Sequence, residues 1–293
     1  MAIEHISDTA RWVAVYRAME SARPDAIFRD PFAKRLAGER GEEIVDRMPR
    51  GRAMAWPMIV RTAVFDEMIL DAVESGGVDT IVNLAAGLDA RPWRLPLPNE
   101  LRWVDVDLPE ILEYKSSSLI AETPRCCYEA VAADLRDADA RRALFERIGS
   151  DARRALVVAE GLLVYLTREQ VGALAADLSA VPSFRSWLID LASPRLLEIM
   201  RKWWGRQLEA GAAPFQFAPE EGTRFFEPFG WREVAFRSTM DDAQRLHREM
   251  RMMWLWRFLG RFSSAKRRKE FERFSGTVLL ESATPPRSGT LKV

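Results

Sequence analysis

The chain has 293 residues, and 48% of them are hydrophobic, so it can bury a sizeable core as one decorated domain. Its 43 acidic and 43 basic residues balance, so no global electrostatic field attracts nucleic acid. The sequence contains neither a basic-flanked apolar leader nor an apolar run of about eighteen residues, so we expect a soluble cytoplasmic protein without a membrane span.

Residues 1–77 indicate an N-terminal helical cap. A first helix is predicted over 8–21, where apolar side chains recur at helical spacing, namely Trp12, Val15, Tyr16 and Met19. Ser7 or Asp8 is suited to be its N-cap. A short helix or turn is expected around Asp30.

A long apolar helix is predicted next, over 53–74. It carries Arg61, is expected to be broken or bent near Pro57, and ends at Gly76 and Gly77. We expect these N-terminal helices to roof a binding site on the domain that follows.

Strand-length apolar segments alternate with helix-length segments from residue 78 to residue 283. The expected strands cover 80–85, 102–107, 128–133, 155–160 and 186–191. Such alternation predicts an α/β fold with a doubly wound, mostly parallel sheet. Two late strand candidates, 231–237 and 276–282, would complete it.

The loop after the first strand and the end of the second predict a nucleoside site. Asp107 lies twenty positions after Gly87, a spacing that places a carboxylate where it can bind a ribose diol. A dinucleotide site needs three glycines for close approach to a pyrophosphate, and Gly87 stands here among alanines. S-adenosylmethionine, which has no pyrophosphate, therefore fits better than a nicotinamide cofactor.

Four motifs in order carry a family resemblance, namely NLAAGLDARPWR, VDVDLPEILEYK, ADLRD and AEGLLVYL. They are similar to motifs of the leucine carboxyl methyltransferase family and its bacterial relatives, some of which methylate polyketides and other secondary metabolites. The resemblance extends over most of the chain. It implies a seven-stranded class I methyltransferase sheet with one antiparallel edge, and an S-adenosylmethionine-dependent O-methyltransferase.

Asp107 and Gly87 each have two interpretations. Asp107 can accept both ribose hydroxyls, or it can be a helix N-cap before Pro109. Gly87 allows close backbone approach to the donor, or is an ordinary turn glycine. Asp105 shares the face of Asp107 and is expected to lie deeper.

The resemblance implies further donor-binding residues. Arg61 would bind the donor carboxylate, Glu160 its ammonium, and Asp134 with Leu135 the adenine. For Arg61 the alternative is an arginine that extends to water, and for Asp134 a solvated loop acid. A buried Glu160 without a partner would be costly, which favours a ligand there.

Other positions bear on the site less directly. Arg11 can reach the donor carboxylate or an acidic substrate, or be a solvated helix-face charge. Ala85 departs from the glycine more usual in the family. Tyr165 is a weak candidate for acceptor hydrogen bonding, with core packing as the alternative. His5 and His247, the only histidines, lie outside the motifs.

A helical lid is expected at about 238–275, followed by a flexible tail over 284–293. The basic segment 244–274 carries an apolar run rich in Trp and Met. It packs over the site as a lid, or binds a membrane surface or an acidic protein. As a lid, with Trp203 and Trp204 extending the wall, it suits an apolar or aromatic small-molecule acceptor bearing a carboxylate or hydroxyl.

Two function classes follow. The first is the O-methyltransferase, and the second is an adenosine-ligand binding or regulatory protein that kept the fold without turnover. No metal site is predicted, because Cys126 and Cys127 are too few for structural zinc, and we interpret them as packing residues.

Overall fold

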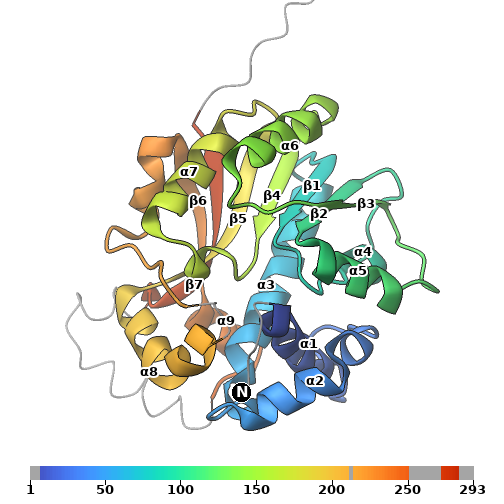
Figure 1. Cartoon of the computed structure of the whole chain (residues 1–293), viewed down its shortest axis with the longest axis vertical. Coiled ribbons are helices and arrows are strands. Elements are labelled where there is room, and N and C mark those ends of the chain that lie inside the picture. Colours follow the sequence, from blue (N-terminus) through green and yellow to red (C-terminus); the bar gives the residue numbers. More distant parts are fainter. Residues whose placement is uncertain (1–6, 211–213, 251–271, 284–293) are drawn as a thin grey trace, which may run out of the picture.

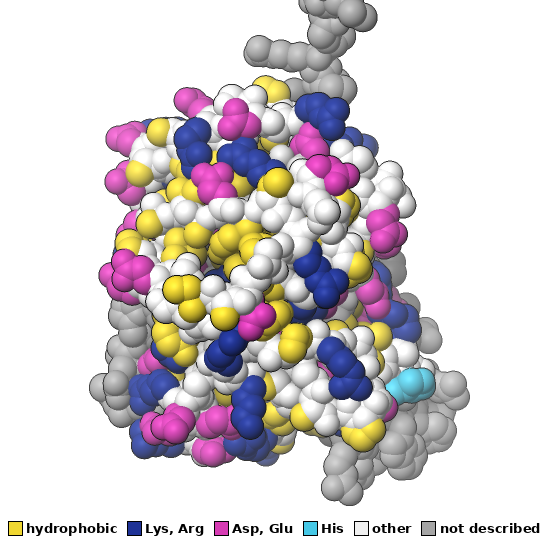
Figure 2. Space-filling model, turned by 90° about the vertical axis from the view of Figure 1, so that its right-hand side faces the viewer, with side chains coloured by type: hydrophobic (Ala, Val, Ile, Leu, Met, Phe, Trp, Pro, Cys, Tyr) yellow, Lys and Arg dark blue, Asp and Glu magenta, His cyan; other side chains and the backbone are white. Residues whose placement is uncertain are grey.

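The computed structural model describes residues 7–210, 214–250 and 272–283 (Figure 1). The apolar run of the basic segment, His5 and the expected tail lie outside these residues. On the face shown in Figure 2, basic and acidic side chains are interspersed, as the balanced composition would suggest.

A seven-stranded sheet with the strand order β3-β2-β1-β4-β5-β7-β6 forms the centre of the protein (Figure 1). The strands are β1 Thr80–Leu84, β2 Arg102–Asp107, β3 Cys127–Ala132, β4 Ala155–Ala159, β5 Phe184–Ala192, β6 Trp231–Ser238 and β7 Ser275–Ser282. The first five pair in parallel, and β7 pairs antiparallel with both β5 and β6. All seven expected strands are confirmed, as is the doubly wound, mostly parallel α/β class.

The expectation of an antiparallel edge is wrong, because the antiparallel strand β7 lies between β5 and β6. The reason is burial: Val278 and Leu280 of β7 are fully buried, which suits an inner strand, whereas Val234 of β6 is 42% exposed. Strand β6, WREVAFRS, mixes charged and apolar residues and can tolerate the solvent-facing edge.

Helices cover both faces of the sheet. They are α1 Ser7–Ser21, α2 Ala33–Arg47, α3 Ala55–Glu74, α4 Arg91–Arg94, α5 Pro109–Ser118, α6 Ala138–Asp151, α7 Arg168–Ser179, α8 Pro194–Ala210 and α9 Thr239–Arg245, with 3-10 turns η1 Arg52–Met54, η2 Leu163–Tyr165 and η3 Gly222–Phe229. One apolar cluster joins α6 and α7 to the sheet, and another joins α3 to the opposite face. Strands β1 and β4 are buried at every residue because both of their faces are covered.

A third apolar cluster joins α1, α2 and α8 beyond the carboxyl ends of the strands. The Trp12 and Trp204 rings meet edge-on at 5.4 Å, which ties α1 to α8. The Tyr16 hydroxyl donates to the Gly51 carbonyl at 2.6 Å. This helical layer lies where the sequence predicts a roof over the site.

Three local expectations need correction. Helix α3 is not broken at Pro57, because this residue lies in the first turn, where a missing N–H breaks no helical hydrogen bond. Helix α2 was not predicted, since Gly38 interrupts its pattern with a φ of 61°. Cys126 packs in the core as expected, but Cys127 is exposed, because it begins β3, a strand at the edge of the sheet.

Candidate active site

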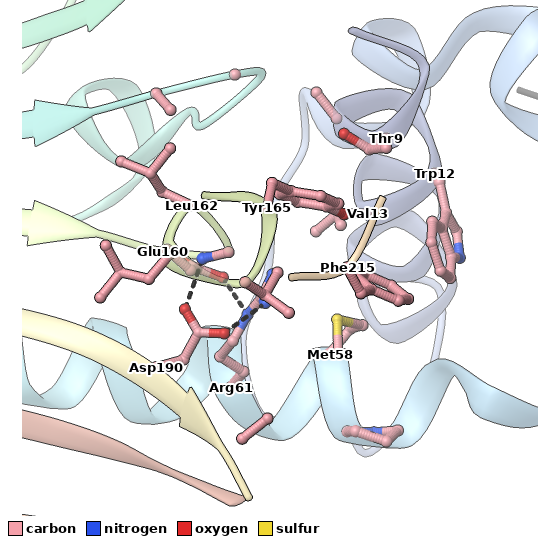
Figure 3. Close-up of a pocket in the computed structure, with 18 of the residues that line it drawn as sticks. Thr9, Trp12, Val13, Met58, Arg61, Glu160, Leu162, Tyr165, Asp190 and Phe215 are labelled. Carbon is pink, nitrogen blue, oxygen red and sulfur yellow. Dashed lines mark hydrogen bonds and ion pairs between the residues drawn. The ribbon is translucent and has the colours of Figure 1, made fainter. Parts of the chain in front are cut away.

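A cavity of about 740 Å³ lies at the carboxyl ends of the parallel strands, and residues of α1, α3 and α8 are also among its lining. Figure 3 shows some of the residues that line it. Open parallel sheets bind ligands at this edge, and the volume is in the usual range of small-molecule sites. Of the sequence-predicted site residues, seven line it: Arg61, Gly87, Asp107, Asp134, Leu135, Glu160 and Tyr165.

Asp107, the last residue of β2, faces the loop that follows β1. Its Oδ2 accepts the Gly87 N–H at 2.6 Å, and its Oδ1 accepts the Leu108 N–H at 2.7 Å. Burial raises the pKa of Asp107, against the lowering effect of these two bonds. The N-cap of α5 is Leu108 and not Asp107, so the capping interpretation is wrong.

The loop after β1 needs left-handed backbone at two positions. Gly87 has a φ of 52°, and a Cβ added there would lie 3.1 Å from the Cβ of Ala10. The left-handed backbone at position 87 and the close approach of α1 therefore both require a glycine there. Ala85 has a φ of 50°, a strained conformation for a residue with a side chain.

Glu160 and Arg61 meet at the cavity (Figure 3). Arg61 Nε donates to Glu160 Oε1 at 2.9 Å, and its Nη1 donates to Asp190 Oδ2 at 3.2 Å. The Arg61 side chain is 13% exposed, so it does not extend to water. Asp190 and Glu160 raise its pKa against the effect of burial.

Arg91, at the start of α4, is a second cation at Glu160. Its Nη1 lies 2.8 Å from Glu160 Oε2 and 2.7 Å from Asp89 Oδ2, and its Nε lies 2.6 Å from Asp66 Oδ1. Glu160 therefore has two protein partners, which removes the sequence-based reason for a ligand there. Burial opposes ionisation, but Arg91 and Arg61 outweigh it and lower the pKa of Glu160.

Arg91 and Asp190 were missed by the sequence reasoning. Arg91 stands inside the first quoted motif, but its burial among three acids is a tertiary arrangement. Asp190 could have been found, because it lies near the end of the fifth predicted strand, at the edge where Asp107 and Glu160 were sought.

Asp134 and Leu135 lie on the turn after β3. Arg136 forms an ion pair with Asp134, with Nη2 and Oδ2 2.7 Å apart, and this lowers the pKa of Asp134. The Asp134 side chain is 40% exposed, so it fits the solvated-acid interpretation while it also lines the cavity.

The structure does not bring Arg11 or Asp105 to the cavity. The Arg11 guanidinium lies 3.8 Å over the Tyr114 ring and donates to the Ala37 carbonyl, on the side of α2. Asp105 is fully buried below Asp107, as expected, and accepts a hydrogen bond from Lys115 Nζ at 2.6 Å.

Tyr165 faces an apolar part of the cavity (Figure 3). Its ring stacks on Phe215 at 5.5 Å, and Thr9 is hydrogen-bonded to its phenol. Burial raises the pKa of Tyr165 to about 12. The same compartment is lined by Trp12, Val13, Met54, Met58, Met200, Trp203 and Trp204.

The ends of the basic segment reach the cavity. Met250 and Phe274, on either side of the part that lies outside the described residues, both line the cavity, as does Met240, which precedes the segment. His247 is exposed, as a surface role predicts. Within 7–210, 214–250 and 272–283, no helix is long and apolar enough to cross a membrane, and no cluster of metal-ligating side chains occurs.

The leucine carboxyl methyltransferase family model matches residues 10–179, more than half of the chain. A protein of Mycolicibacterium gilvum (strain PYR-GCK) is 35% identical over 66% of this chain and 68% of its own length. One of Streptomyces coelicolor is 33% identical over 76% of this chain and 82% of its own length. Both are provisionally named S-adenosyl-L-methionine-dependent methyltransferases.

A similar solved structure is a DUF574 family protein from Streptomyces avermitilis. It is 15% identical, covers 94% of this chain and 97% of its own, and superposes with a TM-score of 0.59. At this identity the likeness concerns the fold, and it agrees with the seven-stranded sheet described above.

Proposed function

This chain belongs to the leucine carboxyl methyltransferase family and is an S-adenosylmethionine-dependent methyltransferase, and we propose that it methylates a carboxylate or hydroxyl oxygen of a small metabolite. We also propose the roles of the site residues given below, and an acceptor molecule that is apolar apart from the oxygen that receives the methyl group. We further propose a division into a cap over 1–77 and a catalytic domain over 78–283, with a lid near 238–275.

The chemistry of the lining residues supports a site for each part of S-adenosylmethionine. Asp107 and Gly87 would bind the ribose, and the Asp107 carboxylate has oxygens suited to a diol. Asp134 and Leu135 would bind the adenine, by hydrogen bonding and apolar contact. Bound S-adenosylmethionine supplies an electrophilic methyl group on a sulfonium.

The charged end of the donor requires one cation and one anion. Arg61, within α3, and Glu160, directly after β4, provide them side by side, with Nε and Oε1 2.9 Å apart, and both line the cavity. A carboxylate on Arg61 and an ammonium on Glu160 would each gain a charge-assisted hydrogen bond. The fit of these two groups supports the donor position.

The acceptor compartment is apolar and rich in aromatic rings. Trp12, Tyr165, Phe215 and Trp204 surround it, with Met58 between α3 and the cavity (Figure 3). Such walls exclude water and hold a flat apolar molecule by contact. The hydroxyls of Tyr165 and Thr9 are placed to orient an acceptor oxygen. The protein's contribution is then proximity, orientation and desolvation.

One observation carries the proposal: a single cavity is lined both by the charged residues assigned to the donor, such as Arg61, Asp107 and Glu160, and by these aromatic side chains. The test is incubation with S-adenosylmethionine and matched pairs of aromatic acids and phenols, with S-adenosylhomocysteine measured as product. Mild alkali then distinguishes a methyl ester, which it cleaves, from an ether, which resists.

Site variants complete the test. We expect Asp107→Ala and Glu160→Ala each to weaken S-adenosylmethionine binding by about 1–3 kcal/mol, because each strands a charge-assisted partner. Unchanged affinity in both variants would contradict the assigned site. Transfer to nitrogen or carbon acceptors, with none to oxygen, would contradict the O-methyltransferase proposal.

A further inference from the structure

Asp190 lies near the end of β5, and its side chain reaches the cavity beside Arg61 (Figure 3). Its two oxygens have different partners. Oδ1 accepts the backbone N–H of Gly161 at 2.5 Å, and Oδ2 accepts Nη1 of Arg61 at 3.2 Å. One carboxylate therefore ties the turn after β4 and the guanidinium on α3 to the end of β5.

Arg61 is restrained on two further sides. Its Nε is bound to Glu160 at 2.9 Å. Gly161 has a φ of 69°, and a Cβ added there would lie 3.1 Å from Nη1 and 3.3 Å from Nη2. The guanidinium therefore packs against bare backbone. Nη2 has no hydrogen bond to another residue in the described part of the chain, so it is the nitrogen left for a ligand.

The other guanidiniums lining the cavity are committed to protein groups. Arg17 binds the Asp30 carboxylate and the Leu88 carbonyl. Arg91 binds three acids. Arg136 binds Asp134 through two of its nitrogens, at the turn after β3. Of the two guanidiniums at Glu160, Arg61 is therefore the one with a terminal nitrogen, Nη2, that bonds no other described residue, since both terminal nitrogens of Arg91 are hydrogen-bonded.

We propose that Asp190 is a positioning residue for the carboxylate of S-adenosylmethionine, an inference that rests on the proposed function. Asp190 holds the Arg61 guanidinium so that it contacts Glu160 through Nε alone and keeps Nη2 for the donor. Without this anchor, Arg61 is free to rotate into a bidentate pair with Glu160, the preferred arginine–carboxylate geometry. That bidentate pair would occupy the Arg61 guanidinium and the Glu160 carboxylate, the two groups that the donor's carboxylate and ammonium would bind.

The test compares two ligands and two variants by calorimetric titration. Asp190→Asn keeps the shape and an oxygen for the Gly161 N–H but removes the charge that anchors Arg61. S-adenosylmethionine is compared with its decarboxylated analogue, which lacks the carboxylate alone. We expect Asp190→Asn to weaken S-adenosylmethionine binding about tenfold or more and to change binding of the analogue less than about threefold, since one charge-assisted hydrogen bond is at stake.

Asp177→Asn is the matched control. Asp177 forms an ion pair with Arg141 between α7 and α6, has similarly low exposure, and does not line the cavity. We expect it to leave binding of both ligands unchanged. Thermal unfolding of each variant establishes that it is folded.

A double-mutant cycle tests whether Asp190 acts through Arg61. In an Arg61→Gln background, Asp190→Asn should have no further effect on S-adenosylmethionine binding. Equal losses for both ligands would overturn the inference, because Asp190 would then only support the fold. So would unchanged binding with reduced turnover, which would place Asp190 at the acceptor. A wild-type protein that binds neither ligand would overturn the proposed function as well.

Discussion

Gly87 combines two constraints that most glycines of the chain do not share. Its φ of 52° is left-handed, and the Ala10 side chain lies within 3.1 Å of where a Cβ would stand. Gly77 has a similar φ of 64° but nothing within 4 Å of its Cβ position. A comparison of Gly77 with Gly87 therefore separates the effect of backbone strain from the effect of the close approach of α1.

We expect Gly77→Ala to reduce the free energy of unfolding by about 1–2 kcal/mol through strain alone, with donor affinity unchanged. Gly87→Ala should cost more, because α1 must shift, and should also weaken donor binding by displacing the N–H that Asp107 accepts. Denaturant titration and calorimetry measure the two effects. Equal losses of stability in the two variants, or an unchanged donor affinity in Gly87→Ala, would contradict the argument that α1 leaves no room for a side chain at position 87.

Asp107 predicts a pH dependence of donor binding. Burial raises its pKa above the ordinary aspartate value, whereas the pKa values of Glu160, Asp89 and Asp134 are lowered. As the pH falls, Asp107 therefore becomes protonated before Asp89 and Asp134, and a protonated carboxyl cannot accept both hydroxyls of a diol.

Donor affinity should consequently fall as the pH drops through the raised pKa of Asp107. Calorimetric titrations from pH 7 down to the ordinary aspartate pKa of about 3.9 test this, with Asp107→Asn as the control, whose weaker binding should vary little over the same range. The folding linkage has the opposite sign: a raised acid pKa contributes stability at low pH that is lost as the pH rises through it. A wild-type affinity that stays constant would exclude Asp107 from the ribose site.

Local spacing could predict that some residues line the cavity, whereas their roles there stay predictions. Asp107, Gly87 and Glu160 end strands or form the turn after one, and parallel strands bring these ends to one edge. The missed Arg91 and Asp190 acquire their roles through partners far along the chain. Arg11 does not line the cavity, although the sequence allowed it to reach the donor. Helical periodicity determines which residues share a face of α1, but tertiary packing determines which face lies against α2.

Among the secondary-structure elements, β2 is tied to α5 and β3 by one buried acid. Asp105 accepts Lys115 Nζ from α5 at 2.6 Å and the Tyr128 hydroxyl from β3 at 2.8 Å. It also accepts Trp103 Nε1 at 2.8 Å and Asn83 Nδ2 at 3.0 Å. Lys115 and Asp105 are both fully buried, so each needs the other's charge.

Lys115→Met should therefore destabilise the protein by about 3–5 kcal/mol, because it leaves Asp105 buried without a counter-charge. Arg153→Ala is the comparison, since the Arg153–Asp79 pair has a similar distance of 2.9 Å but a 91% exposed arginine. That change should cost less than about 1 kcal/mol. Denaturant unfolding measures both, and comparable losses would contradict the buried-pair argument.

The strands could be predicted from sequence because the central ones are short, mostly apolar runs, such as TIVNL and ALVVA. Helix α2 could not, because Gly38 breaks its period while tertiary contacts bury Leu36 and Ile44 on either side. The inner position of β7 depends on pairing with β5, a long-range contact that no local pattern encodes.

For the whole molecule, the cavity brings together distant parts of the chain. Its lining runs from Thr9 on α1 to Thr277 on β7 and includes the ends of β1, β4 and β5. A ligand that fills it contacts both the helical layer and the sheet. Its binding energy therefore adds to the stability of the folded chain, because the unfolded chain has no such site.

Donor at about one hundred times its dissociation constant should raise the unfolding free energy by about 2.7 kcal/mol. For a chain of 293 residues, this corresponds to a rise of about 4 °C in the thermal midpoint. Asp107→Ala at the same donor concentration should lose most of that rise, whereas Gly77→Ala, despite a lower starting midpoint, should keep it. Differential scanning calorimetry of both variants, with and without the donor, measures the rise in the thermal midpoint. A rise that survives in Asp107→Ala would place the donor elsewhere, and a rise lost in Gly77→Ala would mean that the cavity depends on the end of α3 as much as on its own lining.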